Sequence, residues 1–298
     1  MCTSGPTRLL RSASWRPWLL RPALRAGRIA WAMQPMNHDQ APGTLVGVGV
    51  GPGDPELLTL QAIRALRSAD RVAAPAIAHD VPGRAEQVVR AAAPDVEIIR
   101  LVFDMTPDST PGGAEARDAS HVSAAAAIAG WLASGETIAF VTLGDPNIYS
   151  TFPSLARAVA RLHPSVRIET IPGICAFQAL AARSGTVLLD GTESLALVTA
   201  LDGTEHLAAA LDDPERAVVV YKGGRHLPAI SAMLESRGRL AKAVMGELIG
   251  MSGERLEPVA RGARREASYL ATVIVPPTSR GGESAAAGTA SAPPGEVP

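Results

Sequence analysis

Apolar positions along the middle of the chain follow two alternating patterns. Short apolar runs predict buried strands at Thr44–Val50, near Val72, and at Glu97–Leu101, Thr137–Leu143 and Val166–Ile171. Between them, apolar residues recur at helical spacing in Glu56–Ala69, Arg84–Ala93, Ser120–Ala133, Phe152–Leu162 and Ala176–Ser184. Strands that alternate with helices in this way predict a mainly parallel sheet covered by helices.

A second set of elements follows the segment Gly185–Gly191. Its predicted strands are Ser194–Thr199, Ala217–Tyr221, Ala241–Glu247 and Tyr269–Val275, and its predicted helices lie near Glu205–Leu211 and Leu227–Arg237. The sequence therefore predicts an α/β protein with two α/β domains, residues 43–189 and 190–277. A ligand cleft is expected between them.

The two ends of the chain differ in composition from the middle. Residues 1–38 hold six arginines and no acidic residue, and Pro17 and Pro22 argue against a stable helix there. We interpret residues 1–42 as a disordered or mis-annotated leader, with a targeting peptide or a membrane-surface helix as alternatives. Residues 278–298, rich in Ser, Ala, Gly and Pro, are predicted to be a disordered tail.

Charge and cysteine content narrow the class of protein. Beyond residue 38 the chain has 22 basic and 29 acidic residues, which disfavours a nucleic-acid partner. The two cysteines cannot form a disulfide framework, so a reducing cytoplasm is expected. The six histidines lie at least 20 residues apart and no apolar run reaches transmembrane length, so we predict neither a metal site nor a membrane span.

The first glycine-rich segment, residues 47–55, lies between a predicted strand and a predicted helix. Its glycines permit a sharp turn and let a ligand approach the backbone. Gly47 and Gly49 begin a dinucleotide fingerprint, but Pro52 stands at the third glycine position and removes an amide donor. The segment therefore predicts a ligand other than a pyrophosphate, with an ordinary tight turn as the alternative.

The motif at 142–151 (TLGDPNIYST) also follows a predicted strand. Asp145 could accept hydrogen bonds from a ligand. Alternatively, it could form an Asx-turn or cap the helix that begins near Ser150. The sequence leaves both roles open.

Two further motifs follow strands at 171–177 (IPGICAF) and 218–224 (VVVYKGG). Cys175 has no histidine near it in the sequence, so we predict a small buried side chain and not a nucleophile. Lys222 is either a cation of the cleft or a solvated strand end. The Tyr221 side chain lies either in the core or in the cleft.

Together, in order and spacing, these four motifs resemble the tetrapyrrole methylases from about residue 44 to residue 276. The runs at 54–60 (DPELLTL) and 144–151 (GDPNIYST) are similar to the branch that methylates precorrin-2 at C-20. The resemblance implies S-adenosyl-L-methionine as cofactor in the cleft between the domains, precorrin-2 as tetrapyrrole substrate, and a homodimer. Transferred position by position, it places the cofactor contacts at Pro52, Leu143, Gly144, Asp145, Ile148, Cys175, Ala176 and Lys222.

The resemblance also implies a reaction that needs little help from titrating side chains. Methyl transfer from a sulfonium to an enamine-like carbon can rest on alignment and desolvation, so we name no catalytic base. Arginines of the cleft or Lys222 should meet the carboxylates of precorrin-2. The alternatives are the cobalt-bearing substrate, another tetrapyrrole position, a nicotinamide dehydrogenase, which Pro52 disfavours, and a non-catalytic S-adenosylmethionine sensor.

Overall fold

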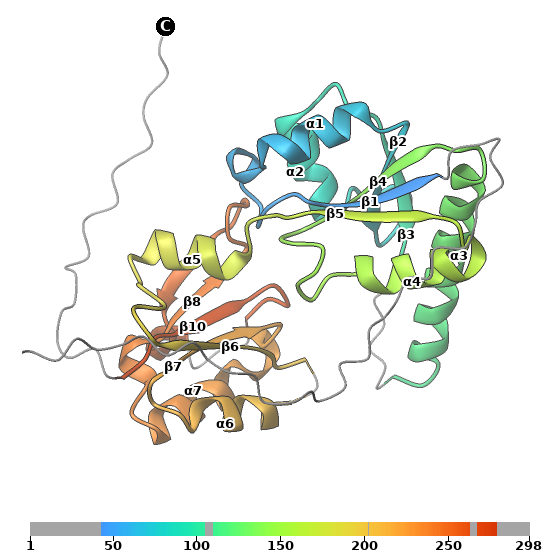
Figure 1. Ribbon diagram of the computed structural model, residues 1–298. Helices are drawn as coiled ribbons and strands as arrows, with labels where there is room; N and C mark the ends of the chain where they lie inside the picture. Colours follow the sequence, from blue (N-terminus) through green and yellow to red (C-terminus); the bar gives the residue numbers. More distant parts are fainter. Residues whose placement is uncertain (1–42, 105–109, 202, 263–266, 279–298) are drawn as a thin grey trace, which may run out of the picture. The chain divides into compact units, whose positions relative to one another are not determined.

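The computed structural model describes residues 43–104, 110–201, 203–262 and 267–278 (Figure 1). The predicted leader, residues 1–42, and the tail beyond residue 278 lie outside these ranges. In the described part of the chain, no helix is both long and apolar enough to cross a membrane.

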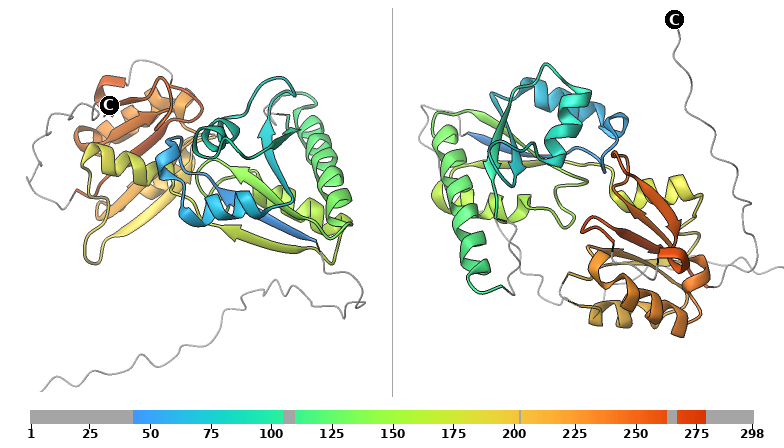
Figure 2. Two further views of the ribbon diagram at one scale, coloured as in Figure 1. Left: turned by 90° about the horizontal axis from the view of Figure 1, so that it is seen from above. Right: turned by 180° about the vertical axis from the view of Figure 1, so that it is seen from behind.

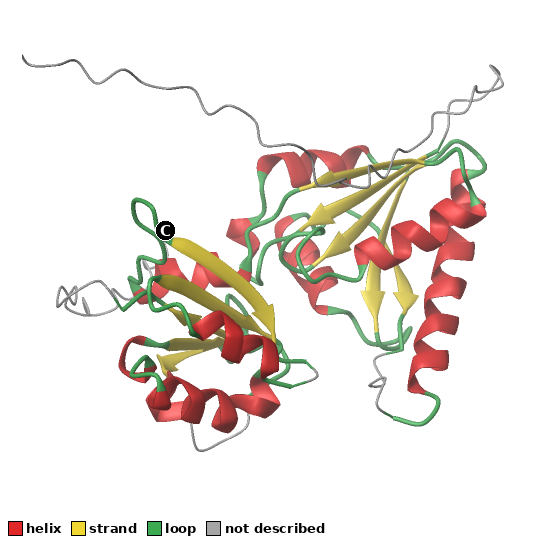
Figure 3. Ribbon diagram, turned by 60° about the horizontal axis from the view of Figure 1, so that its bottom comes forward, coloured by secondary structure: helices red, strands yellow, loops and turns green. Residues whose placement is uncertain are grey.

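The first sheet has five strands in the order β3-β2-β4-β1-β5. All its paired strands are parallel, so their carboxyl ends lie along one edge (Figure 3). This confirms the predicted parallel sheet. Its strands are β1 (Thr44–Gly49), β2 (Arg71–Ala76), β3 (Ile98–Val102), β4 (Thr137–Thr142) and β5 (Arg167–Ile171).

Helices bury both faces of this sheet (Figures 1 and 2). Helices α1 (Leu60–Ser68) and α2 (Arg84–Ala92) pack on one face, while α3 (Gly113–Leu132) and α4 (Phe152–Leu162) pack on the other. In the sheet, β4 lies between β1 and β2, so the connection from β1 to β2 passes over β4. Likewise β1 lies between β4 and β5, so the connection from β4 to β5 passes over β1. The loops after β1 and β4 therefore diverge to opposite faces, and such a switch point is where doubly wound sheets bind ligands.

The second sheet is mixed, with the order β6-β7-β10-β8-β9. Only the β6–β7 pair is parallel among its described strands. The strands are β6 (Ser194–Thr199), β7 (Arg216–Tyr221), β8 (Val244–Glu247), β9 (Arg255–Pro258) and β10 (Thr272–Val275). Helices α6 (Glu205–Leu211) and α7 (Leu227–Ser236) cover one face.

Helix α5 (Ala176–Ser184) packs on the opposite face, against β10 and β8, although it precedes residue 190 in the sequence. The two sheets are thus built from strands on either side of that residue. The division into domains 43–189 and 190–277 stays a prediction.

Several element bounds differ from those predicted. The expected helix Glu56–Ala69 is a 3₁₀ turn η1 (Pro55–Leu57) followed by α1, because Asp54 and Thr59 each accept a backbone N–H and start a helix of their own. Leu60, one of the apolar residues at helical spacing that predicted the helix Glu56–Ala69, is 77% exposed. Helix α3 begins seven residues before the predicted Ser120, at Gly113.

In the second half, the short elements β9 and α8 (Val259–Gly262) were not predicted from the sequence. Strand β8 starts at Val244 because the 3₁₀ turn η3 (Leu240–Lys242) precedes it. A further 3₁₀ turn, η2 (Gly224–His226), precedes α7. Strand β10 starts at Thr272, three residues after the predicted Tyr269.

Arg239 joins the turn before β7 to the end of β10. It is 3% exposed, and its guanidinium donates to the carbonyl oxygens of Asp213, Arg216 and Pro276. Burial lowers the pKa of Arg239, but arginine stays charged because its ordinary pKa is so high. Three backbone acceptors thus depend on one buried cation.

We expect Arg239→Met to lower the free energy of unfolding by about 2 kcal/mol, because it leaves three partly buried carbonyl groups without their charged donor. Arg237→Met is the matched control, since Arg237 forms only a partly exposed ion pair with Asp212 and should cost less than about 1 kcal/mol. Urea unfolding of both variants measures the difference. Equal losses would contradict the role of Arg239.

Candidate functional site

One cavity of about 600 Å³ is lined by residues from both halves of the chain. It lies at the carboxyl edge of the first sheet and also contacts the ends of β7 and β10. All the residues for which the sequence predicted cofactor contacts line this cavity: Pro52, Leu143, Gly144, Asp145, Ile148, Cys175, Ala176 and Lys222. The fold thus brings four separate segments together, and their role in binding stays a prediction.

Three glycines bring the turns after β1, β4 and β5 into backbone contact. A Cβ atom on Gly49 would lie 2.6 Å from the carbonyl oxygen of Gly144 and 2.6 Å from the nitrogen of Gly173. Real Cβ contacts are not this short, so a side chain at Gly49 would force the turns apart. Gly49 therefore serves the contact between turns, in the segment for which the sequence allowed either the approach of a ligand or a tight turn.

Asp145 fixes this junction through both of its carboxylate oxygens. Oδ1 accepts the backbone N–H of Asn147 at 2.8 Å, and Oδ2 accepts the N–H of Gly173 at 3.0 Å. The first bond is the Asx-turn that the sequence allowed. Asp145 does not cap α4, since Ser150 Oγ accepts the N–H of Phe152 at that helix start. Asp145 lines the cavity, and its carboxylate bonds two of the cavity walls together.

Cys175 and Tyr221 form a protonated pair on another wall of the cavity. Cys175 is 7% exposed, and burial, aided by the nearby Asp145 carboxylate, raises the pKa of its thiol to about 11. Burial and the thiol raise the pKa of Tyr221, whose hydroxyl oxygen accepts the N–H of Phe177. At neutral pH neither group is a base or a nucleophile, which agrees with the prediction for Cys175.

Tyr149 joins the first half of the chain to the second at the cavity wall. Its hydroxyl donates to the carbonyl of Leu197 at 2.8 Å, and its own carbonyl accepts from Lys222 Nζ at 3.1 Å. Its ring meets that of Tyr221 edge to face. The Lys222 ammonium also lies 5.6 Å from the Tyr269 ring and has no acidic partner among the described residues.

The described non-glycine residues with left-handed backbone all lie at the cavity. They are Tyr149, with a φ of 48°, Lys222 (58°) and Leu248 (51°). Each such conformation costs about 1–3 kcal/mol, so the surrounding contacts must hold it in place. Strain of this kind is typical of functional sites.

An ion cluster positions the segment after β8. Arg183 at the end of α5 pairs with Asp54 at 2.9 Å and with Glu254 at 2.6 Å, and Glu254 also accepts the N–H of Gly250. The segment that this cluster fixes contains Leu248, Ile249 and Met251, which line the cavity.

The structure adds a wall that the sequence did not identify. It follows the ends of β2 and β3 and contains Ile77, Val81, Arg84, Gln87 and Phe103. The position of these residues after parallel strands could have indicated it, because such strands end at a common edge. Their types, two aliphatic side chains with one aromatic ring, one amide and one arginine, gave no separate indication.

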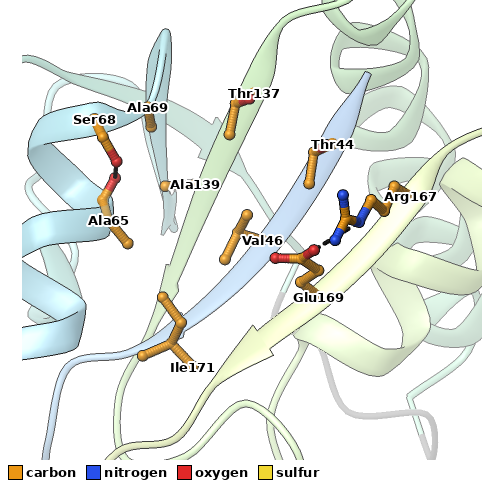
Figure 4. A pocket seen from close by; sticks show the side chains of 10 residues that line it. All are labelled: Thr44, Val46, Ala65, Ser68, Ala69, Thr137, Ala139, Arg167, Glu169 and Ile171. Atoms are coloured by element: carbon orange, nitrogen blue, oxygen red, sulfur yellow. Dashed lines mark hydrogen bonds and ion pairs between the residues drawn. The ribbon is translucent and has the colours of Figure 1, made fainter. Parts of the chain in front are cut away.

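A second cavity, of about 370 Å³, lies on a face of the first sheet (Figure 4). Small and apolar side chains line it, together with Arg167 and Glu169, which pair with each other. It contains none of the predicted site residues, and its charges already neutralise one another. The cavity at the strand ends is therefore the candidate site.

Comparisons with known proteins find relatives of this chain in sequence and in structure. The family model of the Tetrapyrrole (Corrin/Porphyrin) Methylases matches residues 44–263. The chain is 35% identical to a Sinorhizobium sp. protein named Precorrin-2 C(20)-methyltransferase, over 78% of this chain and 95% of the relative. It is 31% identical to a Salmonella typhimurium protein named Cobalt-precorrin-2 C(20)-methyltransferase, over 72% of this chain and 86% of the relative.

Among solved structures, the fold is similar to that of uroporphyrin-III C-methyl transferase from Thermus thermophilus complexed with S-adenyl homocysteine. The TM-score is 0.56 at 24% identity, over 78% of this chain and 97% of the other. This similarity confirms the α/β fold with two sheets.

We expect Asp145→Ala to lower the free energy of unfolding by about 2 kcal/mol, because two backbone N–H groups lose a charged acceptor. Asp145→Asn keeps one acceptor oxygen, so its free energy of unfolding should lie between those of Asp145→Ala and the wild type. Asp213 accepts one N–H in an Asx-turn away from the cavity, so Asp213→Ala should cost less than about 1 kcal/mol. Thermal melting that does not separate Asp145→Ala from the wild type would contradict the junction role.

We expect the Cys175 thiol to resist alkylation in the native protein. With a pKa of about 11, its thiolate fraction at pH 7.5 is more than a hundredfold below that of an ordinary cysteine. Iodoacetamide labelling of a Cys2→Ser variant, which leaves Cys175 as the one cysteine in the sequence, measures the rate in buffer and in guanidinium chloride. Equal rates in both would show that the thiol is accessible and ionised.

Proposed function

Since the chain belongs to the tetrapyrrole (corrin/porphyrin) methylases, we propose that it methylates precorrin-2 at C-20 with S-adenosyl-L-methionine, giving precorrin-3A in cobalamin biosynthesis. The observation that carries the proposal is the convergence of the eight predicted cofactor residues on one cavity. The similarity of the chain to relatives named for this reaction supports the choice of substrate. Those names include both metal-free and cobalt-bearing substrates.

The chemistry of the cavity wall fits the proposed cofactor. The turn at Leu143–Asp145 presents backbone groups, and the small residues Cys175 and Ala176 leave room beside α5. The Lys222 ammonium, without an acidic partner among the described residues, suits the carboxylate of the methionine portion. Pro52 offers no amide N–H, which fits a cofactor without a phosphate.

The bound cofactor would supply an electrophilic methyl group. The chain would bind and orient the two partners and exclude water, because most of the cavity wall is apolar. Cys175 and Tyr221 hold their protons at neutral pH, and the Asp145 oxygens accept two backbone N–H groups. Proton abstraction by these groups is not part of the proposal.

The proposal extends to the assembly and its location. A homodimer rests on the family resemblance, and light scattering of the purified chain tests it. A cytoplasmic location rests on the two cysteines, which form no disulfide framework, and on the buried free thiol of Cys175.

Product analysis tests the reaction directly. The chain is incubated anaerobically with S-adenosyl-L-methionine and either metal-free or cobalt-bearing precorrin-2, and mass spectrometry and NMR identify the product. A gain of one methyl group at C-20 supports the proposal, and the better of the two substrates identifies the metal state. Methylation at another ring position would replace the C-20 assignment.

We expect S-adenosylhomocysteine to bind in the micromolar range while NADH does not bind, because Pro52 interrupts the amide pattern that a pyrophosphate needs. Calorimetry with both ligands measures this difference. Lys222→Gln should lower the affinity for S-adenosylhomocysteine by about tenfold or more. Tight NADH binding would overturn the cofactor assignment.

A further inference from the structure

The wall after β2 carries exposed aliphatic side chains at the cavity. Ile77 is 66% exposed and Val81 is 43% exposed, and both line the cavity. Large aliphatic side chains exposed beside a cavity lose unfavourable contact with water when an apolar ligand covers them. This wall therefore suits a ligand with a broad apolar surface.

Arg84, at the start of α2, stands in the same wall. It lines the cavity, is exposed, and makes no ion pair or hydrogen bond with another described residue. The nearest acidic residue in the sequence, Glu86, is buried and already pairs with Arg90 and Arg100. The Arg84 guanidinium is thus free to pair with a ligand.

Charges on the rest of the cavity do not compete for this guanidinium. Asp145 is the one acidic residue among the described lining residues, and both its oxygens already accept backbone N–H groups. Lys222, the other cation, lies beside Tyr149 and Tyr269. A ligand that covers the aliphatic side chains after β2 and pairs with the Arg84 guanidinium needs an apolar body and an anionic arm.

We propose that Ile77, Val81 and Arg84 form the subsite for one edge of the tetrapyrrole, with a substrate carboxylate paired to the Arg84 guanidinium. This assignment rests on the proposed function and assigns to the substrate a wall that is separate from the predicted cofactor residues. An apolar macrocycle with carboxylate arms matches both the aliphatic surface and the cation. Arginine can pair with a carboxylate through two parallel hydrogen bonds, which also fixes the orientation of the ring.

The test measures tetrapyrrole and cofactor affinity on matched variants of the full chain. Arg84→Gln should weaken binding of the tetrapyrrole by about tenfold to a hundredfold, and Arg84→Lys should recover part of the loss. Affinity for S-adenosylhomocysteine and the melting temperature should not change, because Arg84 is exposed and pairs with no other residue that the structure describes. Arg64→Gln is the control: Arg64 is exposed on α1 and does not line the cavity.

A chemical probe identifies the carboxylate as the partner. Wild type should prefer the tetrapyrrole over the same compound with methyl-esterified carboxylates, and Arg84→Gln should reduce that preference by about tenfold. An unchanged preference in a variant that binds S-adenosylhomocysteine normally would overturn the subsite. If the wild type binds neither S-adenosylhomocysteine nor the tetrapyrrole, the proposed function fails as well.

Discussion

The site depends on the contact between three backbone turns at the carboxyl edge of the first sheet. Gly49, Gly144 and Gly173 approach so closely that a side chain on Gly49 would overlap the neighbouring turns. Asp145 then bonds the turn after β4 to the turn after β5. Both turns continue directly into cavity walls, the first at Ile148 and the second at Cys175. A change of less than 1 Å at this junction would therefore move both walls at once.

The contacts through which the second half of the chain completes the cavity include residues with strained backbone. Tyr149, Lys222 and Leu248 are held with positive φ, and each is fixed by specific partners. Tyr149 and Lys222 hold one another through a hydrogen bond. Leu248 begins the segment that Glu254 and Arg183 fasten to Asp54. The strained residues belong to the contacts that attach the second half to the first, so the strain and the completed cavity depend on the same interactions.

The sequence predicted the parallel sheet well, because strand runs and glycine turns are local signals. The grouping of the motif residues came from the family resemblance, and all eight line one cavity. The errors in the predictions arose where tertiary packing overrides local pattern. Leu60 fits a helical apolar face, but the capping residue Thr59 restarts the helix and leaves Leu60 exposed. The wall at Ile77 and Arg84 was missed because its residues have no motif of their own and meet the cavity only through the strand order.

The two predicted roles of Asp145, turn former and ligand acceptor, need not exclude one another in this geometry. A carboxylate oxygen has two lone pairs, and each Asp145 oxygen uses one for a backbone N–H, which leaves acceptor capacity toward the cavity. Cys175 and Tyr221 are neutral neighbours, so among the described lining residues the charges without an ion-pair partner are the cations Arg84 and Lys222. These cations lie on different segments, one after β2 and one after β7. A cavity built in this way can hold anionic groups of two different ligands, and the proposed transfer from a carboxylate-bearing cofactor to a polycarboxylate substrate would use both cations.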